Sequence, residues 1–208
     1  MKKPKPNQAK HTDGSIDWAK QCAWDVEFAK RVLLDRGEIA PMYVMHTPRG
    51  IIPIATDLAD KPRVRALVQL MCFAHGAIGL TFIGEAWMKA IEDDEALRPG
   101  ESLADLEQRI VLPSESERRV EIVSVVTLYY DATGARQSTT ILREILRGAD
   151  GKPTGLGAEI SAADAMIGPG AEILPERRAT PDEQAAAKQV LDVVEQAGVF
   201  ETRMQPSA

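Results

Sequence analysis

The stretch that decides the fold runs from residue 39 to residue 91 and reads IAPMYVMHTPRGIIPIATDLADKPRVRALVQLMCFAHGAIGLTFIGEAWMKAI. Residues 39–47 and 51–56 are apolar and carry β-formers, and the turn signal Pro-Arg-Gly separates them. This pattern predicts a β-hairpin. Because Pro53 has no N–H to donate to a neighbouring strand, the second strand is predicted to have one side at an edge or a bulge.

A helix and a strongly apolar strand complete this stretch. Asp60 can cap the helix, and Pro62 fits its first turn. The apolar face of that helix has helical spacing and consists of Val64, Leu67, Val68, Met71 and His75. Residues 78–83 (IGLTFI) are apolar at nearly every position, which is typical of a strand covered on both faces, so we predict a central strand there. The side chains predicted for the core are Leu67, Met71, Phe82 and Val123.

The flanking sequence adds helices and strands on both sides. Ser15 is a candidate cap for a helix that reaches about Arg36 and presents an apolar stripe, with Asp25 at the edge of the stripe. Residues 120–130 are the strongest strand signal, and a Thr-Gly turn leads to a partner strand over 136–147. The latter also fits a helical period, and the hairpin turn decides for strand. Shorter elements are predicted from Ser102 to Arg109 (a helix) and over 156–160 (a strand).

Together these elements predict an α+β fold, a single mostly antiparallel sheet with helices packed on it, in the order α-β-β-α-β-β-β-β and then a C-terminal helix. The 208 residues suit one domain with appendages. We expect a disordered basic tail over 1–13, one domain over 14–160 with an acidic loop over 91–119, a linker over 161–179, and a helix over 180–198 that begins at a capping box.

Charge and composition restrict the partners. The net charge is −6, and residues 91–121 alone hold ten acidic residues against four arginines. A broad basic face for nucleic acid is therefore disfavoured. The acidic loop suits a protein partner, and the C-terminal helix suits docking on the domain or on a second copy. No apolar run approaches the roughly 18 residues of a membrane span, and the N-terminus does not read as a secretory signal.

The two cysteines, Cys22 and Cys72, lie within helical patterns and are expected to be buried thiols in a reducing cytoplasm, although a disulfide remains open. Neither a zinc spacing nor a nucleotide-binding or hydrolase motif occurs in the sequence. We therefore expect no cofactor and assign no metal site.

Glu85 is the most interesting carboxylate, because it follows the central strand and precedes Trp87. A carboxylate at a strand end can enter a cleft, where burial raises its pKa. Asp57, Glu85 and either His46 or His75 could then form an acid/base or metal-binding group. The alternatives are a surface ion pair for Glu85 and ordinary core positions for the histidines.

Glu85 and Trp87 lie two residues apart on one predicted strand, so their side chains share a face with Ile83 and lie opposite Phe82. Such a pair suits a ligand or partner pocket. It equally suits a structural hydrogen bond from the indole N–H to the carboxylate.

The run Thr81–Met88 (TFIGEAWM), the acidic Pro-containing loop, and the run Ser116–Glu121 (SERRVE) before a strand and a Thr-Gly turn resemble small uncharacterised bacterial and phage proteins. The resemblance covers about residues 15–160. It implies a bacterial or phage cytoplasmic origin and a role for Glu85-Ala86-Trp87, and it supplies no catalytic residue. The sequence thus favours a non-enzymatic interaction or accessory protein, with a small metal-dependent hydrolase using Asp57, Glu85 and His46 or His75 as the alternative.

Overall fold

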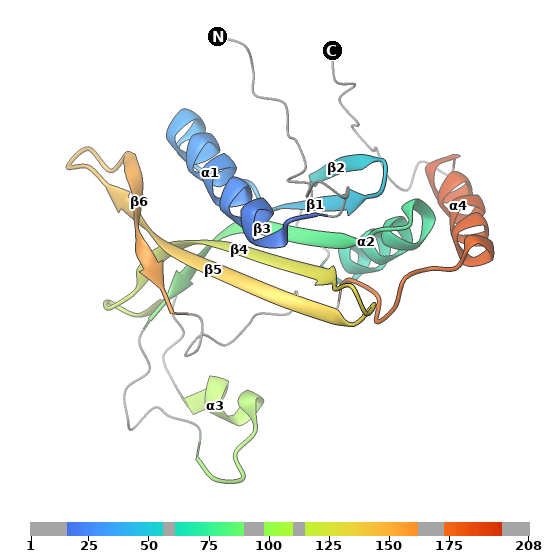
Figure 1. Ribbon diagram of the computed structural model, residues 1–208. Coiled ribbons are helices and arrows are strands. Elements are labelled where there is room, and N and C mark those ends of the chain that lie inside the picture. The colour runs from blue at the N-terminus through green and yellow to red at the C-terminus, as the bar shows by residue number, and fades with distance from the viewer. Residues whose placement is uncertain (1–15, 56–60, 90–97, 110–114, 162–172, 197–208) are drawn as a thin grey trace.

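The structure is a computed structural model, and it describes residues 16–55, 61–89, 98–109, 115–161 and 173–196 (Figure 1). The tail over 1–13, Asp57 and parts of the acidic loop and linker lie outside these ranges. The elements in chain order are α1 (Trp18–Arg36), β1 (Met42–Thr47), β2 (Gly50–Ala55), α2 (Lys61–His75), β3 (Gly79–Met88), α3 (Leu103–Arg109), β4 (Val120–Tyr130), β5 (Arg136–Arg147), β6 (Pro153–Ile160) and α4 (Pro181–Gln196).

The strands form one six-stranded sheet in the order β2-β1-β3-β4-β5-β6, and every neighbouring pair is antiparallel. This confirms the predicted α+β class and the single antiparallel sheet. β2, which contains Pro53, lies at an edge of the sheet, and β3 lies inside it, as their sequences predict. Residues 136–147 form a strand rather than a helix, because their β-branched residues complete the hairpin with β4.

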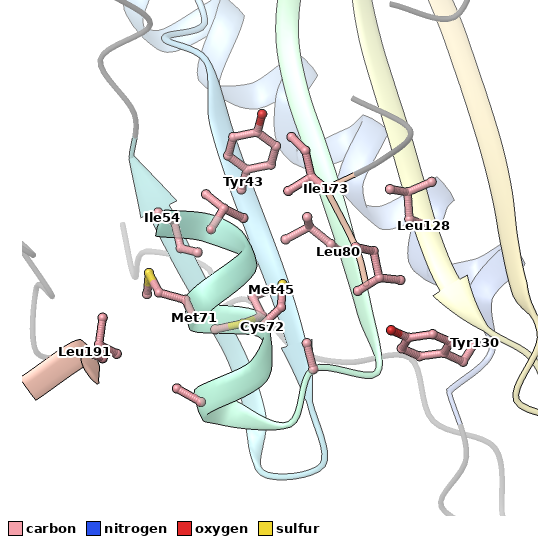
Figure 2. Close-up of a cluster of buried hydrophobic side chains, with 14 residues drawn as sticks. Tyr43, Met45, Ile54, Met71, Cys72, Leu80, Leu128, Tyr130, Ile173 and Leu191 are labelled. Carbon is pink, nitrogen blue, oxygen red and sulfur yellow. The ribbon is translucent and has the colours of Figure 1, made fainter. Parts of the chain in front are cut away.

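Helices cover both faces of the sheet (Figure 1). On one face, α1 packs through Val26, Ala29 and Leu33 against Val44, Ile83, Val123 and Val125. On the other face, α2 lies over the sheet, and α4 packs against α2 and adds Leu191 to the cluster. Figure 2 shows this second cluster, with Met71 and Cys72 on α2 and Met45 and Leu80 on the neighbouring strands. We call the two sides the α1 face and the α2 face.

Of the residues predicted for the core, Met71 and Val123 are buried, whereas Leu67 and Phe82 are half-buried at the rim of the α2-face cluster. Phe82 packs against Tyr43, with the ring centroids 5.2 Å apart. The alternation predicted for β3 is confirmed, since Ile83 belongs to the α1 face and Phe82 to the α2 face.

Trp18, at the start of α1, lies over Gly79 of β3, a residue that has no side chain. A Cβ at Gly79 would overlap the six-membered ring of Trp18. The indole stacks on Tyr129 with centroids 4.8 Å apart and meets His46 edge-on at 5.3 Å. Gly79 therefore provides the space in which α1 approaches the sheet.

The start of α1 differs from the prediction. The N-cap of α1 is Asp17 rather than Ser15, because the Asp17 carboxylate accepts the N–H of Lys20. Gly37 ends the helix in the left-handed conformation, as predicted.

The described end of the segment predicted as a linker belongs to the core. Ile173 and Leu174 are buried in the α2-face cluster. The hydroxyl of Tyr130 donates to the Pro175 carbonyl at 2.6 Å, and Arg136 donates to the Leu174 carbonyl at 2.8 Å. The Pro and Gly residues around this segment favoured a linker in the prediction. Two adjacent apolar residues are too few to show a helical or strand period.

None of the helices in the described part of the chain combines the length and the apolar character needed to cross a bilayer.

Candidate functional site

The structure does not bring Glu85 together with either histidine. His46 lies opposite Gly79 at the start of β3, and Glu85 lies six positions further along that strand. At about 3.4 Å per residue, their backbones are roughly 20 Å apart. His75 ends α2, on the other face of the sheet. Asp57 lies outside the described residues, so its part in such a group stays a prediction.

His46 belongs instead to a polar cluster between α1 and the sheet. All members of this cluster are buried, and they are Gln21, Cys22, Asp25, His46, Thr81 and Thr127. Two of the strand members, Thr81 and Thr127, lie directly opposite each other on β3 and β4. The cluster therefore joins α1 to β1, the next element in the chain, and to β3 and β4, which are far from it in sequence.

The Thr81 hydroxyl is the centre of this polar cluster. It donates to Asp25 Oδ2 at 3.0 Å, and it lies 3.0 Å from His46 Nε2 and 3.1 Å from Thr127 Oγ1. Because the hydroxyl has one hydrogen and gives it to Asp25, His46 Nε2 and Thr127 must donate to the Thr81 oxygen. Gln21 Nε2 donates to the other carboxylate oxygen at 3.0 Å.

Burial controls the protonation of the polar cluster. It raises the pKa of Asp25 to about 6, although hydrogen bonds from Gln21 and Thr81 oppose the shift. Burial also lowers the pKa of His46 to about 4, so the imidazole is neutral near pH 7. With the proton on Nε2, the Nδ1 atom of His46 is an acceptor, and none of the described residues donates a hydrogen bond to it.

This polar cluster is closed to substrates. His46 has no exposed surface and Asp25 is only 6% exposed, with α1 above them and the sheet below. Because a reacting group must meet its substrate, we assign the cluster a structural role, the attachment of α1 to β1, β3 and β4. Sequence reasoning reached Asp25 only as the edge of an apolar stripe. The available signal was its i, i+4 spacing from Gln21 inside that stripe.

Glu85 and Trp87 lie on the α1 face at the opposite end of β3. The Glu85 carboxylate accepts the backbone N–H of Ile39 at 2.6 Å. Partial burial, the main cause, raises the pKa of Glu85, and the Ile39 hydrogen bond opposes that shift. The partner of Glu85 is thus a backbone donor that lies 46 residues away in the chain, which neither alternative from the sequence included.

Trp87 is 43% exposed and has a cation against its ring, because the guanidinium of Arg119 lies 4.6 Å from the ring centroid. Glu121, opposite Trp87 on β4, accepts two hydrogen bonds from Arg147 at 2.6 and 2.7 Å. We call the surface made by Glu85, Trp87, Arg119, Glu121 and Arg147 the Trp87 platform.

His75 lies at a hollow at the other end of the sheet, between the β1–β2 turn, the end of α2 and the start of α4. In the part of the chain that the structure describes, no group of three or more His, Cys, Asp or Glu side chains is arranged to hold a metal ion.

No protein-family model matches the chain, and neither a curated protein nor a solved structure is significantly similar to it.

Proposed function

We propose that this chain is a non-enzymatic interaction protein that docks a protein partner on the Trp87 platform. The observation that carries the proposal is the exposed indole of Trp87 at the end of β3, with the Arg119 guanidinium against its ring. Tryptophan and arginine are the residues most enriched at the energetic centres of protein interfaces.

The platform is held in place before any partner binds. Glu85 is held by the Ile39 backbone, and Glu121 is held by the paired hydrogen bonds of Arg147. A surface whose side chains are already ordered loses less conformational entropy on binding. This supports the Trp87 platform over more scattered exposed side chains as the docking surface.

The acid-rich connection between β3 and β4 indicates the chemistry of the partner. Met88 and Val120 pair at the ends of these strands, so residues 89–119 leave and return beside Trp87. These residues hold nine acidic side chains against one lysine and four arginines, a net charge of −4. A partner that places an apolar side chain on Trp87 and basic side chains toward this connection would complement the surface.

The test compares Trp87→Ala with Trp24→Ala. Trp24 is a matched control, because it is 38% exposed and has Lys20 5.9 Å from its ring centroid, but it lies on α1. Partners captured by the full chain are identified, and the purified partner is titrated against each variant. We expect at least tenfold weaker binding for Trp87→Ala and parent-like binding for Trp24→Ala. Equal affinities for the two variants would remove the Trp87 platform as the docking surface.

The compartment we propose is the cytoplasm. Cys22 and Cys72 are both free and buried, and burial raises the pKa of the Cys72 thiol to about 12. Buried, protonated thiols suit a reducing environment. The proposal follows the expectation from the resemblance to bacterial and phage proteins.

The hydrolase alternative requires Glu85 and a histidine in one cleft, and the separation of Glu85 from both histidines gives it no support. Self-association through α4 stays a second candidate, because Val190 and Val193 are 51% and 64% exposed on that helix. Sedimentation of the parent and of Val193→Glu across a concentration series tests it. A monomer at every concentration would remove the candidate.

A further inference from the structure

The hollow beside His75 has the size of a small-molecule site. Its volume is about 500 Å³, within the range in which small ligands bind. Its lining is mixed: Ile51, Ile52 and Ala74 contribute apolar surface, and Arg49, His75, Gln184 and Lys188 contribute polar groups. It lies at the Gly79 end of β3, whereas the Trp87 platform lies at the Met88 end, so the two surfaces are independent.

The ionisable side chains at the hollow are all basic. Arg49 comes from the β1–β2 turn, His75 from the last turn of α2 and Lys188 from α4, and none of the described residues that line the hollow is Asp or Glu. Three separate segments thus direct basic groups at one place, although the chain as a whole has a net charge of −6. Such convergence costs electrostatic free energy that a bound anion would offset.

The groups around His75 show that these charges are close enough to act on one another. The pKa of His75 is lowered first by burial, then by the charge of Lys188, and less strongly by the charge of Arg49. Glu195, further along α4, opposes the shift and has other interactions of its own. The neighbouring charges together lower the pKa of His75, as expected for a site where cations predominate.

The frame that carries these bases is fixed. The Thr47 hydroxyl donates to the Gly50 carbonyl at 2.9 Å and accepts the N–H of Arg49 at 3.2 Å, which holds the β1–β2 turn. On the other side, the Gln184 amide donates to the Ala179 carbonyl and fills the space where Gly76 has no Cβ. Gln184 therefore offers its amide at the wall of the hollow from a defined position.

We propose that this hollow binds the oxyanion of a small molecule, a phosphate or a carboxylate, through Arg49, His75 and Lys188. The guanidinium can give two parallel hydrogen bonds to such a group, and the ammonium adds a second charge. The apolar remainder of the ligand lies against Ile51 and Ile52.

The experiment titrates the full chain with inorganic phosphate and, separately, with citrate, at constant ionic strength set by chloride. Calorimetry gives the affinity, and NMR follows the His75 imidazole, which His75→Gln assigns. The double variant Arg49→Gln/Lys188→Gln is compared with Lys152→Gln, whose lysine is 81% exposed in the β5–β6 turn. All three substituted side chains in this comparison are exposed, so the fold is retained.

We expect at least one of the two anions to bind and to raise the pKa of His75, because a nearby negative charge favours the imidazolium. Binding should weaken at least tenfold in the double variant and stay unchanged in Lys152→Gln. A stronger response to phosphate or to citrate assigns the class of oxyanion. Absence of binding of both anions at millimolar concentration overturns the proposal. So does equal loss in the two variants, or binding that leaves His75 unaffected.

Discussion

The two faces of the sheet are covered by helices in different ways. Under α2, the sheet side is filled by side chains such as Met45, Leu80 and Leu128, and the contact is made by apolar surface. Under α1, an apolar part built on Val123 and Val125 continues into the buried polar cluster around Thr81. Apolar contact depends mainly on area, whereas hydrogen bonds are directional. Buried apolar area therefore stabilises the α2 face, whereas directional hydrogen bonds fix the position of α1 on the sheet.

The largest effect is expected on the α2 face. Leu80→Ala removes a side chain that is 2% exposed and leaves a cavity between the sheet and α2, at a cost of about 2–5 kcal/mol. Leu34→Ala is the control, because Leu34 is 45% exposed on α1. Chemical denaturation should show a lower midpoint for Leu80→Ala alone. Similar midpoints for both variants would contradict the assignment of Leu80 to the core.

Removal of the central hydroxyl tests the α1 face. Thr81→Val keeps the side-chain shape but leaves Asp25, His46 and Thr127 without their shared partner. A buried polar group without a partner costs about 1–3 kcal/mol. Thr154→Val is the matched control, because the Thr154 hydroxyl donates to the Leu146 carbonyl at an exposed position. A Thr81→Val protein as stable as the control would show that the buried polar cluster contributes no net stability.

The pH dependence separates Asp25 from His46. The folded-state pKa of Asp25 is raised from 3.8 to about 6, so its contribution to stability is full below pH 3.8 and is lost as the pH rises to about 6. The folded-state pKa of His46 is lowered from 6.5 to about 4, so its contribution is present above pH 6.5 and is lost as the pH falls to about 4. In the parent, the pH dependences of stability that arise from Asp25 and from His46 therefore have opposite signs.

Single substitutions should expose each slope. Relative to the parent, Asp25→Asn should lose stability as the pH falls from about 6 to 4, and His46→Gln should gain stability over the same interval. We expect differences on the order of 1 kcal/mol. Denaturation midpoints measured at several pH values check this. The acidic surface groups are the same in all three proteins, so their titration affects the three midpoints alike. Slopes of the same sign in both variants would contradict the opposed titrations.

The smallest effect is expected at Glu85, on the part of the α1 face beyond the helix. Glu85→Ala removes the acceptor of the Ile39 N–H, at a cost of about 1 kcal/mol, because that group is only partly buried. Glu85→Gln keeps an acceptor and should cost less. Thermal unfolding of the two variants distinguishes them. A Glu85→Ala protein that melts with the parent would show that this bond does not hold the Ile39 segment.

The fold was predictable because its signals are local. Each signal is contained in a short continuous segment: the Pro-Arg-Gly turn, the helical period over 61–75 and the β-branched run over 120–130. The cap of α1 moved by two residues because both Ser15 and Asp17 can accept the same kind of hydrogen bond.

The polar cluster could not be predicted in the same way. Asp25 and Thr81 are 56 residues apart, and threonine is an ordinary strand residue, so nothing nearby in the sequence marks it as the centre of a network. Glu85 was recognised as unusual, but its partner is a backbone N–H, which every residue except proline has. The hollow depends on three segments that meet only in the folded chain. His75 alone among its bases was a candidate from sequence.

The overlap between Gly79 and Trp18 limits how this sequence can change over evolutionary time. Every codon one nucleotide away from a glycine codon that alters the residue adds at least a Cβ, and the indole ring occupies that space. A change at residue 79 is therefore accepted only if residue 18 becomes smaller, and a smaller residue 18 gives up the stacking on Tyr129. Positions 18 and 79 are expected to vary as a pair.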